Sequence, residues 1–113
     1  QLLGAGDYWL RPPYGIADSA AKRWADSPLI LWSVDPEDWK DMNTEREVKL
    51  IVSEAQDGAI ILMHDIFPES VDAALQVVDQ LHAQGYLFCT VDELFAARGI
   101  ALESGEMYWN AYP

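Results

Sequence analysis

The chain has 113 residues, half of them hydrophobic, and its 19 Asp and Glu residues against 7 Lys and Arg give a net charge of −12. This size and composition predict one globular domain at most, and the acidic balance without basic clusters disfavours binding to nucleic acid or to an anionic membrane surface. No apolar stretch is long enough to span a membrane, and the single cysteine excludes an intrachain disulfide and a site built from several cysteines.

The N-terminal third is predicted to form two strands separated by a helix. The first strand covers residues 7–11 and ends at Pro12, and the helix runs from its N-cap residue, Asp18, to about residue 26. The second strand covers residues 29–34, where an uninterrupted apolar run is typical of a strand that is covered on both faces.

The middle of the chain is predicted to form a helix, a strand and a second helix. Thr44 and Glu47 have the spacing of a capping box, which predicts the start of the first helix. Its buried face is predicted to hold Val48, Ile51, Val52 and Ala55. The strand covers residues 59–63, and the second helix opens at 68–70 and ends at Gly85. The inner face of this second helix is predicted to hold Val71, Ala74, Leu75, Val78 and Leu81.

The C-terminal third is predicted to begin with a strand over residues 86–91, in which Cys89 occupies a buried position. Asp92 is a candidate N-cap residue for a short helix that ends near Ala97. Residues 99–113 contain aromatic side chains without a clear period, so no element is predicted there.

This alternation predicts an α/β fold with a parallel sheet, in which functional residues lie at the carboxyl ends of the strands. Three motifs meet that rule, because each ends or follows a predicted strand: Arg11-Pro12-Pro13-Tyr14-Gly15, Asp35-Pro36-Glu37-Asp38-Trp39 and Leu62-Met63-His64-Asp65. Four strand–helix units are too few to close a barrel, so we expect a complementary segment to cover the open sheet edges.

His64 is the first candidate catalytic residue. It leaves an apolar run at a strand end, where its imidazole can act as a general acid near neutral pH. A carboxylate at Asp35 or Asp38 could accept a hydrogen bond from the ring and fix its tautomer. The alternatives are a core histidine bonded to backbone and, for the aspartates, a turn or N-cap role, which is the preferred interpretation for Asp35. His82, in the last turn of a predicted helix, is interpreted as structural.

Three further residues are candidates for binding or orientation. Arg11 carries a permanently charged fork that suits a buried carboxylate, and a surface salt bridge is the alternative. The backbone N–H at Tyr14, after a rigid Pro-Pro pair, could stabilise an oxyanion, although a simple turn is preferred from the residues alone. Trp39 can form an apolar wall for a sugar ring or an acyl group, or pack in the core.

The two histidines do not form a metal site by themselves. A hydrolytic zinc site needs three protein ligands, whereas His64 and His82 stand on different predicted elements without a third histidine. We therefore assign no metal ligand to this chain. No G-x-S-x-G motif supports a serine nucleophile.

In order and spacing, the three motifs resemble those of polysaccharide deacetylases of the NodB-homology type, carbohydrate esterase family four. The family patterns R-x-P-[FY], D-x-x-D-W and L-x-H are matched here, and the resemblance runs from about Tyr8 to Leu102. The two N-terminal motifs of the family, T-F-D-D-G and H-[ST]-x-x-H, have no counterpart. The resemblance implies that residues 1–113 are the C-terminal portion of one catalytic domain, a distorted (β/α) barrel that a companion N-terminal segment completes.

The resemblance also implies a chemistry. His64 is then the general acid that protonates the departing amine, Asp38 pairs with it, and Arg11 orients a catalytic base supplied by the companion segment. That segment also binds a divalent metal of the zinc type. The implied reaction is removal of N-linked acetyl groups from peptidoglycan or a chitin-type glycan.

The same resemblance assigns substrate contacts and a location. The backbone N–H of Tyr14 stabilises the oxyanion, Trp39 shapes the groove wall, and Leu62 lines the acetyl-methyl pocket. An acetylated polysaccharide places the protein outside the cell or in the cell envelope. Two alternatives stay open: an O-acetyl xylan esterase of the same family, and a half-barrel binding module without activity.

Overall fold

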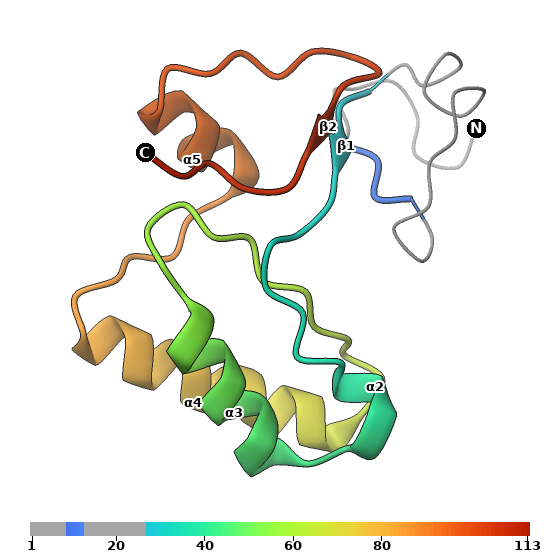
Figure 1. The fold of residues 1–113 in the computed structure, drawn as a ribbon, viewed down its shortest axis with the longest axis vertical. Coiled ribbons are helices and arrows are strands. Elements are labelled where there is room, and N and C mark those ends of the chain that lie inside the picture. The colour runs from blue at the N-terminus through green and yellow to red at the C-terminus, as the bar shows by residue number, and fades with distance from the viewer. Residues whose placement is uncertain (1–8, 13–26) are drawn as a thin grey trace.

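The computed structural model describes residues 9–12 and 27–113. The predicted helix over 18–26, Tyr14 and the first residues of the predicted strand 7–11 lie outside the described residues. The elements are, in chain order, β1 (Leu29–Ile30), α2 (Asp38–Asp41), α3 (Thr44–Glu54), α4 (Pro68–Ala83), α5 (Val91–Ala97) and β2 (Met107–Tyr108) (Figure 1).

The sheet is parallel, as the sequence predicts, but it is short. β1 pairs with β2 in parallel, with Leu29 opposite Met107, and Leu10 forms a parallel bridge to Leu29. A further parallel bridge joins Val34 to Ile61. The predicted strands 29–34 and 59–63 are therefore extended segments with few backbone hydrogen bonds to neighbouring strands. Residues 99–113 supply β2. No element was predicted there, because a two-residue strand is too short to show a period.

The predicted strand over 86–91 is wrong. None of the strand pairs or bridges among the described residues involves 86–90, Leu87 is 85% exposed, and Cys89 is exposed rather than buried. Extended backbone becomes a strand only beside a partner, and the described residues place none there. The following helix begins earlier than predicted, because Thr90 rather than Asp92 is the N-cap and forms a capping box with Glu93.

The start of α3 also differs from its prediction. Asn43 is the N-cap, and its side chain accepts a hydrogen bond from the backbone N–H of Arg46. Thr44 is the first helical residue instead, and its hydroxyl donates to the carbonyl of Glu69 at 3.0 Å. Two neighbouring residues that can both cap a helix make this boundary ambiguous in the sequence.

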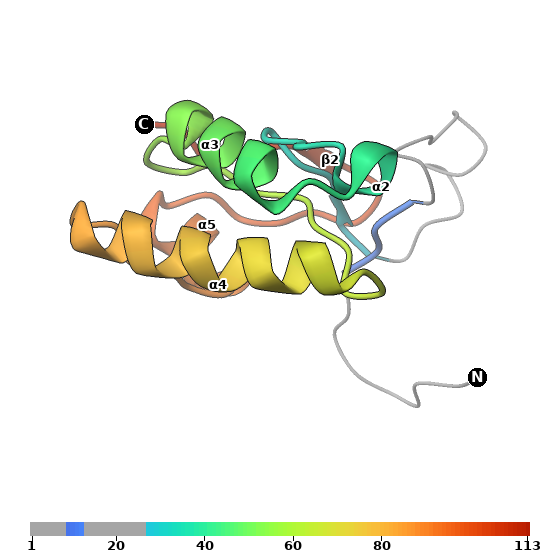
Figure 2. The same cartoon turned by 90° about the horizontal axis from the view of Figure 1, so that it is seen from below.

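α3 and α4 run alongside each other and share one core cluster (Figure 2). The residues that α4 buries are Ser70, Ala73, Val77 and Leu81. Of the inner face predicted for α4, Leu81 is buried, whereas Val71, Leu75 and Val78 are exposed. The helix carries apolar side chains around most of its circumference, so contact with α3 decides which side is covered. A second cluster joins β1 and α5 through Ile30, Ile60, Phe95 and Ala111.

Gly58 fixes the C-terminal segment against the turn after α3. Its φ is +93°, its carbonyl accepts the N–H of Ala111 at 2.7 Å, and a Cβ there would overlap the backbone of Ala111 and Tyr112. We expect Gly58→Ala to lower the free energy of unfolding by more than about 2 kcal/mol, because it adds a backbone clash to left-handed strain. Gly85→Ala is the matched control, since Gly85 has φ +95° with no atom within 4 Å of the added Cβ. Urea denaturation should show a smaller loss of about 1 kcal/mol for this control, and equal losses would contradict the clash.

Candidate functional site

The four-residue helix α2 places the second motif. Asp35 accepts the backbone N–H of Glu37 through Oδ1 at 2.9 Å, which is the turn role that the sequence favours for it. Glu37 and Met42 flank the helix with φ of 51° and 49°, a left-handed conformation that residues other than glycine adopt rarely. The tight turn sends Asp38 inward, where it is fully buried, and leaves Trp39 53% exposed.

Asp38 holds His64 by two contacts. Its Oδ2 accepts the backbone N–H of His64 at 2.7 Å, and its Oδ1 lies 2.7 Å from the ring Nδ1. With an ionised carboxylate as partner, Nδ1 carries a proton and donates it to Asp38. The other ring nitrogen, Nε2, is then left for chemistry, and the His64 side chain is 40% exposed. The structure therefore brings together the candidate acid and the candidate carboxylate that the sequence picked from separate motifs.

The charge state of Asp38 follows from its surroundings. Burial raises the pKa of this carboxyl, but hydrogen bonds from the His64 ring, the His64 backbone and the Ser70 side chain together outweigh burial and hold the pKa below its usual range. Asp38 is therefore ionised at neutral pH, the state that favours accepting two N–H groups.

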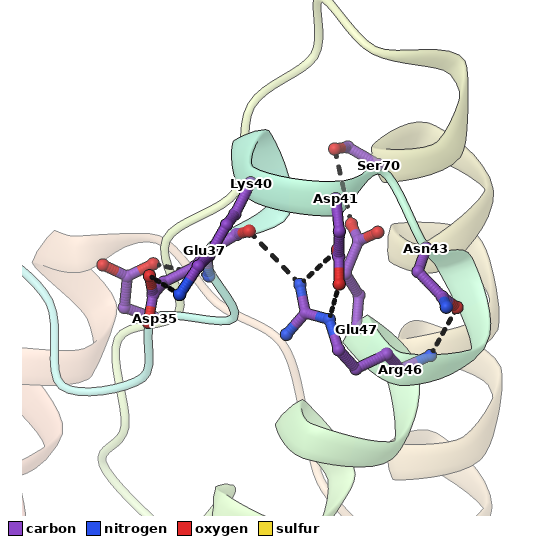
Figure 3. A network of polar contacts seen from close by, with 8 residues as sticks. All are labelled: Asp35, Glu37, Lys40, Asp41, Asn43, Arg46, Glu47 and Ser70. Atoms are coloured by element: carbon purple, nitrogen blue, oxygen red, sulfur yellow. Dashed lines mark hydrogen bonds and ion pairs between the residues drawn. The ribbon is translucent and has the colours of Figure 1, made fainter.

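Glu47 is a buried carboxyl close to this pair. It is fully buried on α3, its Oε1 lies 3.4 Å from the Ser70 hydroxyl, and its buried Oε2 has no hydrogen-bond partner (Figure 3). Burial and then the negative charge of Asp38 raise its pKa. The sequence assigned Glu47 only to a capping box. Its position one turn before Ile51, on the buried face of α3, was the available signal.

An exposed ion pair joins α2 to α3. Arg46 donates through Nε and Nη2 to the two carboxylate oxygens of Asp41 at 2.7 and 2.8 Å, and Nη2 also reaches the Glu37 carbonyl at 3.2 Å (Figure 3). The hydrogen bonds of this pair lower the pKa of Asp41 and raise that of Arg46. The fork of Arg46 is thus engaged by Asp41, at the edge of the turn that carries Asp38.

Arg11 stands apart from the Asp38–His64 pair. Its Nε donates to the carbonyl of Ile30 at 3.2 Å, its Nη2 donates to the carbonyl of Leu31 at 3.3 Å, and its guanidinium lies 5.8 Å from the centre of the Trp32 ring. Burial lowers its pKa. No carboxylate in the described ranges forms an ion pair with Arg11. It is a cation held in place by backbone carbonyls.

The remaining predicted residues occupy different settings. Leu62 is buried two residues before His64, and its backbone N–H donates to the Val34 carbonyl at 2.9 Å. Tyr14 lies outside the described residues. His82 is exposed in the last turn of α4, the position that the sequence predicts for it.

The part of the chain that the structure describes does not fit a metal ion. No group of three His, Cys, Asp or Glu side chains in that part could hold one, and the Nδ1 of His64 is engaged by Asp38. In the same part, no helix is long and apolar enough to cross a membrane.

Comparison with known proteins gives a consistent set of relatives. No family model matches the chain. The peptidoglycan-N-acetylglucosamine deacetylase PgdA of Listeria monocytogenes serotype 1/2a is 40% identical over 101 residues, which are 89% of this chain and 21% of that protein.

Solved structures share the fold. A structure described as T48 deacetylase with substrate has a TM-score of 0.82 and 44% identity, covering 88% of this chain and 49% of that chain. A family 4 acetyl xylan esterase from Clostridium thermocellum, in complex with a cobalt ion, has a TM-score of 0.82 and 26% identity, covering 90% and 52%. The chain therefore corresponds to about half of each of these solved chains.

Proposed function

Because the chain belongs to the polysaccharide deacetylases of carbohydrate esterase family 4, we propose that it is the C-terminal portion of a catalytic domain that removes N-linked acetyl groups from peptidoglycan or a chitin-type glycan. The observation that carries this proposal is the Asp38–His64 pair, in which one imidazole nitrogen is tied to a buried carboxylate and the other is left for the substrate.

The pair suits the proton transfer that amide hydrolysis requires. A carboxylate base takes a proton from water as the water oxygen bonds to the acetamide carbonyl carbon. The carbon–nitrogen bond then breaks, and the nitrogen must gain a proton to leave as an amine. His64 delivers that proton from Nε2, and acetate is the second product. Asp38 keeps the proton on Nδ1 and fixes the ring, so that Nε2 is the nitrogen that transfers its proton.

Arg11 serves a group outside the described residues. Its guanidinium is fixed by two backbone carbonyls, yet it carries a charge that no described carboxylate neutralises. We propose that it orients the carboxylate base of the reaction, contributed by a companion N-terminal segment. The length of the solved relatives, about twice that of the matched part, supports such a segment.

The substrate contacts follow the same proposal. The backbone N–H of Tyr14 stabilises the oxyanion, Leu62 lines the acetyl-methyl pocket beside His64, and the exposed Trp39 ring forms a groove wall for a sugar ring. Acetylated wall glycans place the protein outside the cell or in its envelope.

A divalent metal is the cofactor of this proposal, with zinc as the expected ion. The cobalt ion of the xylan esterase structure supports a divalent metal in this family. Since the described residues do not fit one, we propose that the companion segment binds it.

Acetate release tests the proposal. The natural polypeptide that carries this chain should release acetate from N-acetylated peptidoglycan, lose this activity with a chelator, and regain it with Zn²⁺ or Co²⁺. Acetylated xylan is the comparison substrate, because one structural relative is an acetyl xylan esterase. Faster acetate release from acetylated xylan would mean that the substrate is an O-acetyl ester rather than an N-acetyl amide. Tight glycan binding with no release from either substrate would favour a binding module.

A further inference from the structure

The segment that crosses from α4 to α5 is apolar and uncovered among the described residues (Figure 1). In this segment Leu87 is 85% exposed and Phe88 is 50% exposed. None of the backbone N–H and C=O groups of residues 87–89 forms a hydrogen bond with another described backbone group. Unpaired backbone groups beside exposed apolar side chains are a template for pairing with a further strand.

Both ends of this segment are fixed by contacts within the chain. The backbone N–H of Tyr86 donates to the Leu81 carbonyl at 3.0 Å, and the Tyr86 hydroxyl donates to the Ala55 carbonyl at 3.2 Å. At the other end, Thr90 has extended backbone angles and forms the capping box of α5. A partner strand would therefore meet a segment whose ends are already ordered, which reduces the entropy lost on association.

The helix that leads into the segment also carries an uncovered apolar row. Val71, Leu75 and Val78 are exposed, and their spacing of four and three residues places them along one side of α4. The buried side of the same helix packs in the core cluster that it shares with α3. Two consecutive parts of the chain thus leave apolar side chains uncovered, which differs from the scattered single residues of an ordinary surface.

We propose that residues 87–89 are the docking edge for a β-strand of the companion N-terminal segment, whose apolar side chains also cover the exposed row on α4. The proposal rests on the proposed function, which supplies the companion segment. Each solved relative is about twice as long as its matched part, which supports an occupant from the same polypeptide. A strand fits this edge, because an extended backbone can pair with the free N–H and C=O groups of residues 87–89.

Hydrogen exchange in the natural polypeptide that carries this chain tests whether the edge is covered. At neutral pH, the N–H groups of residues 87–89 that face the companion strand should exchange at least about 100-fold more slowly than in an unfolded peptide. This protection should not depend on protein concentration, because the companion belongs to the same polypeptide. Exchange at the rate of an unfolded peptide would overturn the proposal, and protection that appears only as the concentration rises would assign the edge to a second copy instead.

A matched pair of variants tests the role of the apolar side chains. Leu87→Asp should raise the exchange rate of residues 88–89 on the order of tenfold or more, because it places a charge in the proposed contact. Ile66→Asp is the control, since Ile66 is 75% exposed and lies outside the docking edge, and it should leave that rate at the parent value. Equal rates in Leu87→Asp and the parent would contradict the proposal.

Photochemical cross-linking identifies the occupant. In the natural polypeptide, Phe88→p-benzoylphenylalanine should cross-link to a peptide that precedes Gln1, as read by mass spectrometry. Cross-links to residues that follow Pro113, or to a second copy, would overturn the proposal. None of these measurements uses acetate release. An inactive protein with a protected edge would therefore refute only the proposed deacetylation, and an active protein with an open edge would refute only the docking.

Discussion

Replacing His64 by alanine is expected to lower the rate of acetate release by roughly 10²–10⁴-fold, the usual contribution of a positioned general acid. The described residues place no second imidazole near Asp38, so the departing nitrogen would have to take its proton from water. Folding should be little affected, because the backbone N–H of residue 64 can still donate to Asp38.

His82→Ala is the control for this experiment. His82 is exposed in the last turn of α4, so its loss removes an imidazole without touching the Asp38 pair. Its rate of acetate release should equal that of the parent, measured on the same glycan at saturating substrate. If His64→Ala kept the parent rate with an unchanged circular dichroism spectrum, the general acid would have to be another group.

Asp38→Asn is expected to reduce both activity and stability. The carboxylate accepts two N–H groups from His64, whereas an amide has one acceptor oxygen, so one contact becomes a repulsive pairing of two donors. The free energy of unfolding should fall by about 2 kcal/mol, in the range for a buried hydrogen bond to a charged group. Acetate release should fall on the order of 10²-fold or more, because the ring loses the partner that fixes its tautomer.

The stability loss of Asp38→Asn should depend on pH in a defined direction. The folded state holds the pKa of Asp38 below its usual value, so ionised Asp38 stabilises the fold above the unfolded pKa of about 3.9. That contribution is lost as the pH falls through the folded pKa, where the carboxylate gains a proton. Urea denaturation should therefore show the full difference between parent and variant near neutral pH and a shrinking difference in acid.

Asp41→Asn provides the matched comparison in the same helix. Asp41 is exposed and pairs with Arg46, so this substitution should change the free energy of unfolding far less than Asp38→Asn does and leave acetate release unchanged. A loss in Asp41→Asn as large as that in Asp38→Asn would show that α2 as a whole, rather than the contacts of Asp38, sets both effects.

The local sequence predicted α3, α4 and α5, though not the four-residue α2, and it picked the pair that carries the proposal. Periodicity and turn residues predicted helices close to α3, α4 and α5, because the signals for each helix are contained within a few residues. The motif around Asp38 and the motif ending at His64 were chosen because each lies beyond an apolar run. Parallel strand ends converge, so two residues 26 positions apart could be expected to meet.

Contacts between distant segments could not be predicted in this way. The buried side of α4 depends on its packing against α3, and the exposure of Leu87 and Cys89 depends on the absence of a described strand beside them. Glu47 looked like a capping residue, and only the approach of α4 made it a buried carboxyl beside Ser70.

The sequence by itself therefore determined α3, α4 and α5, the parallel direction of the short sheet and the residues of the Asp38–His64 pair, because these depend on local conformation and on the order of elements. Only the tertiary structure decided which helix faces are covered and how Asp38 contacts both the ring and the backbone of His64. It also decided that the Glu47 carboxyl is buried beside Ser70. Burial and hydrogen-bond partners are set by segments far apart in the chain, and no local pattern records them.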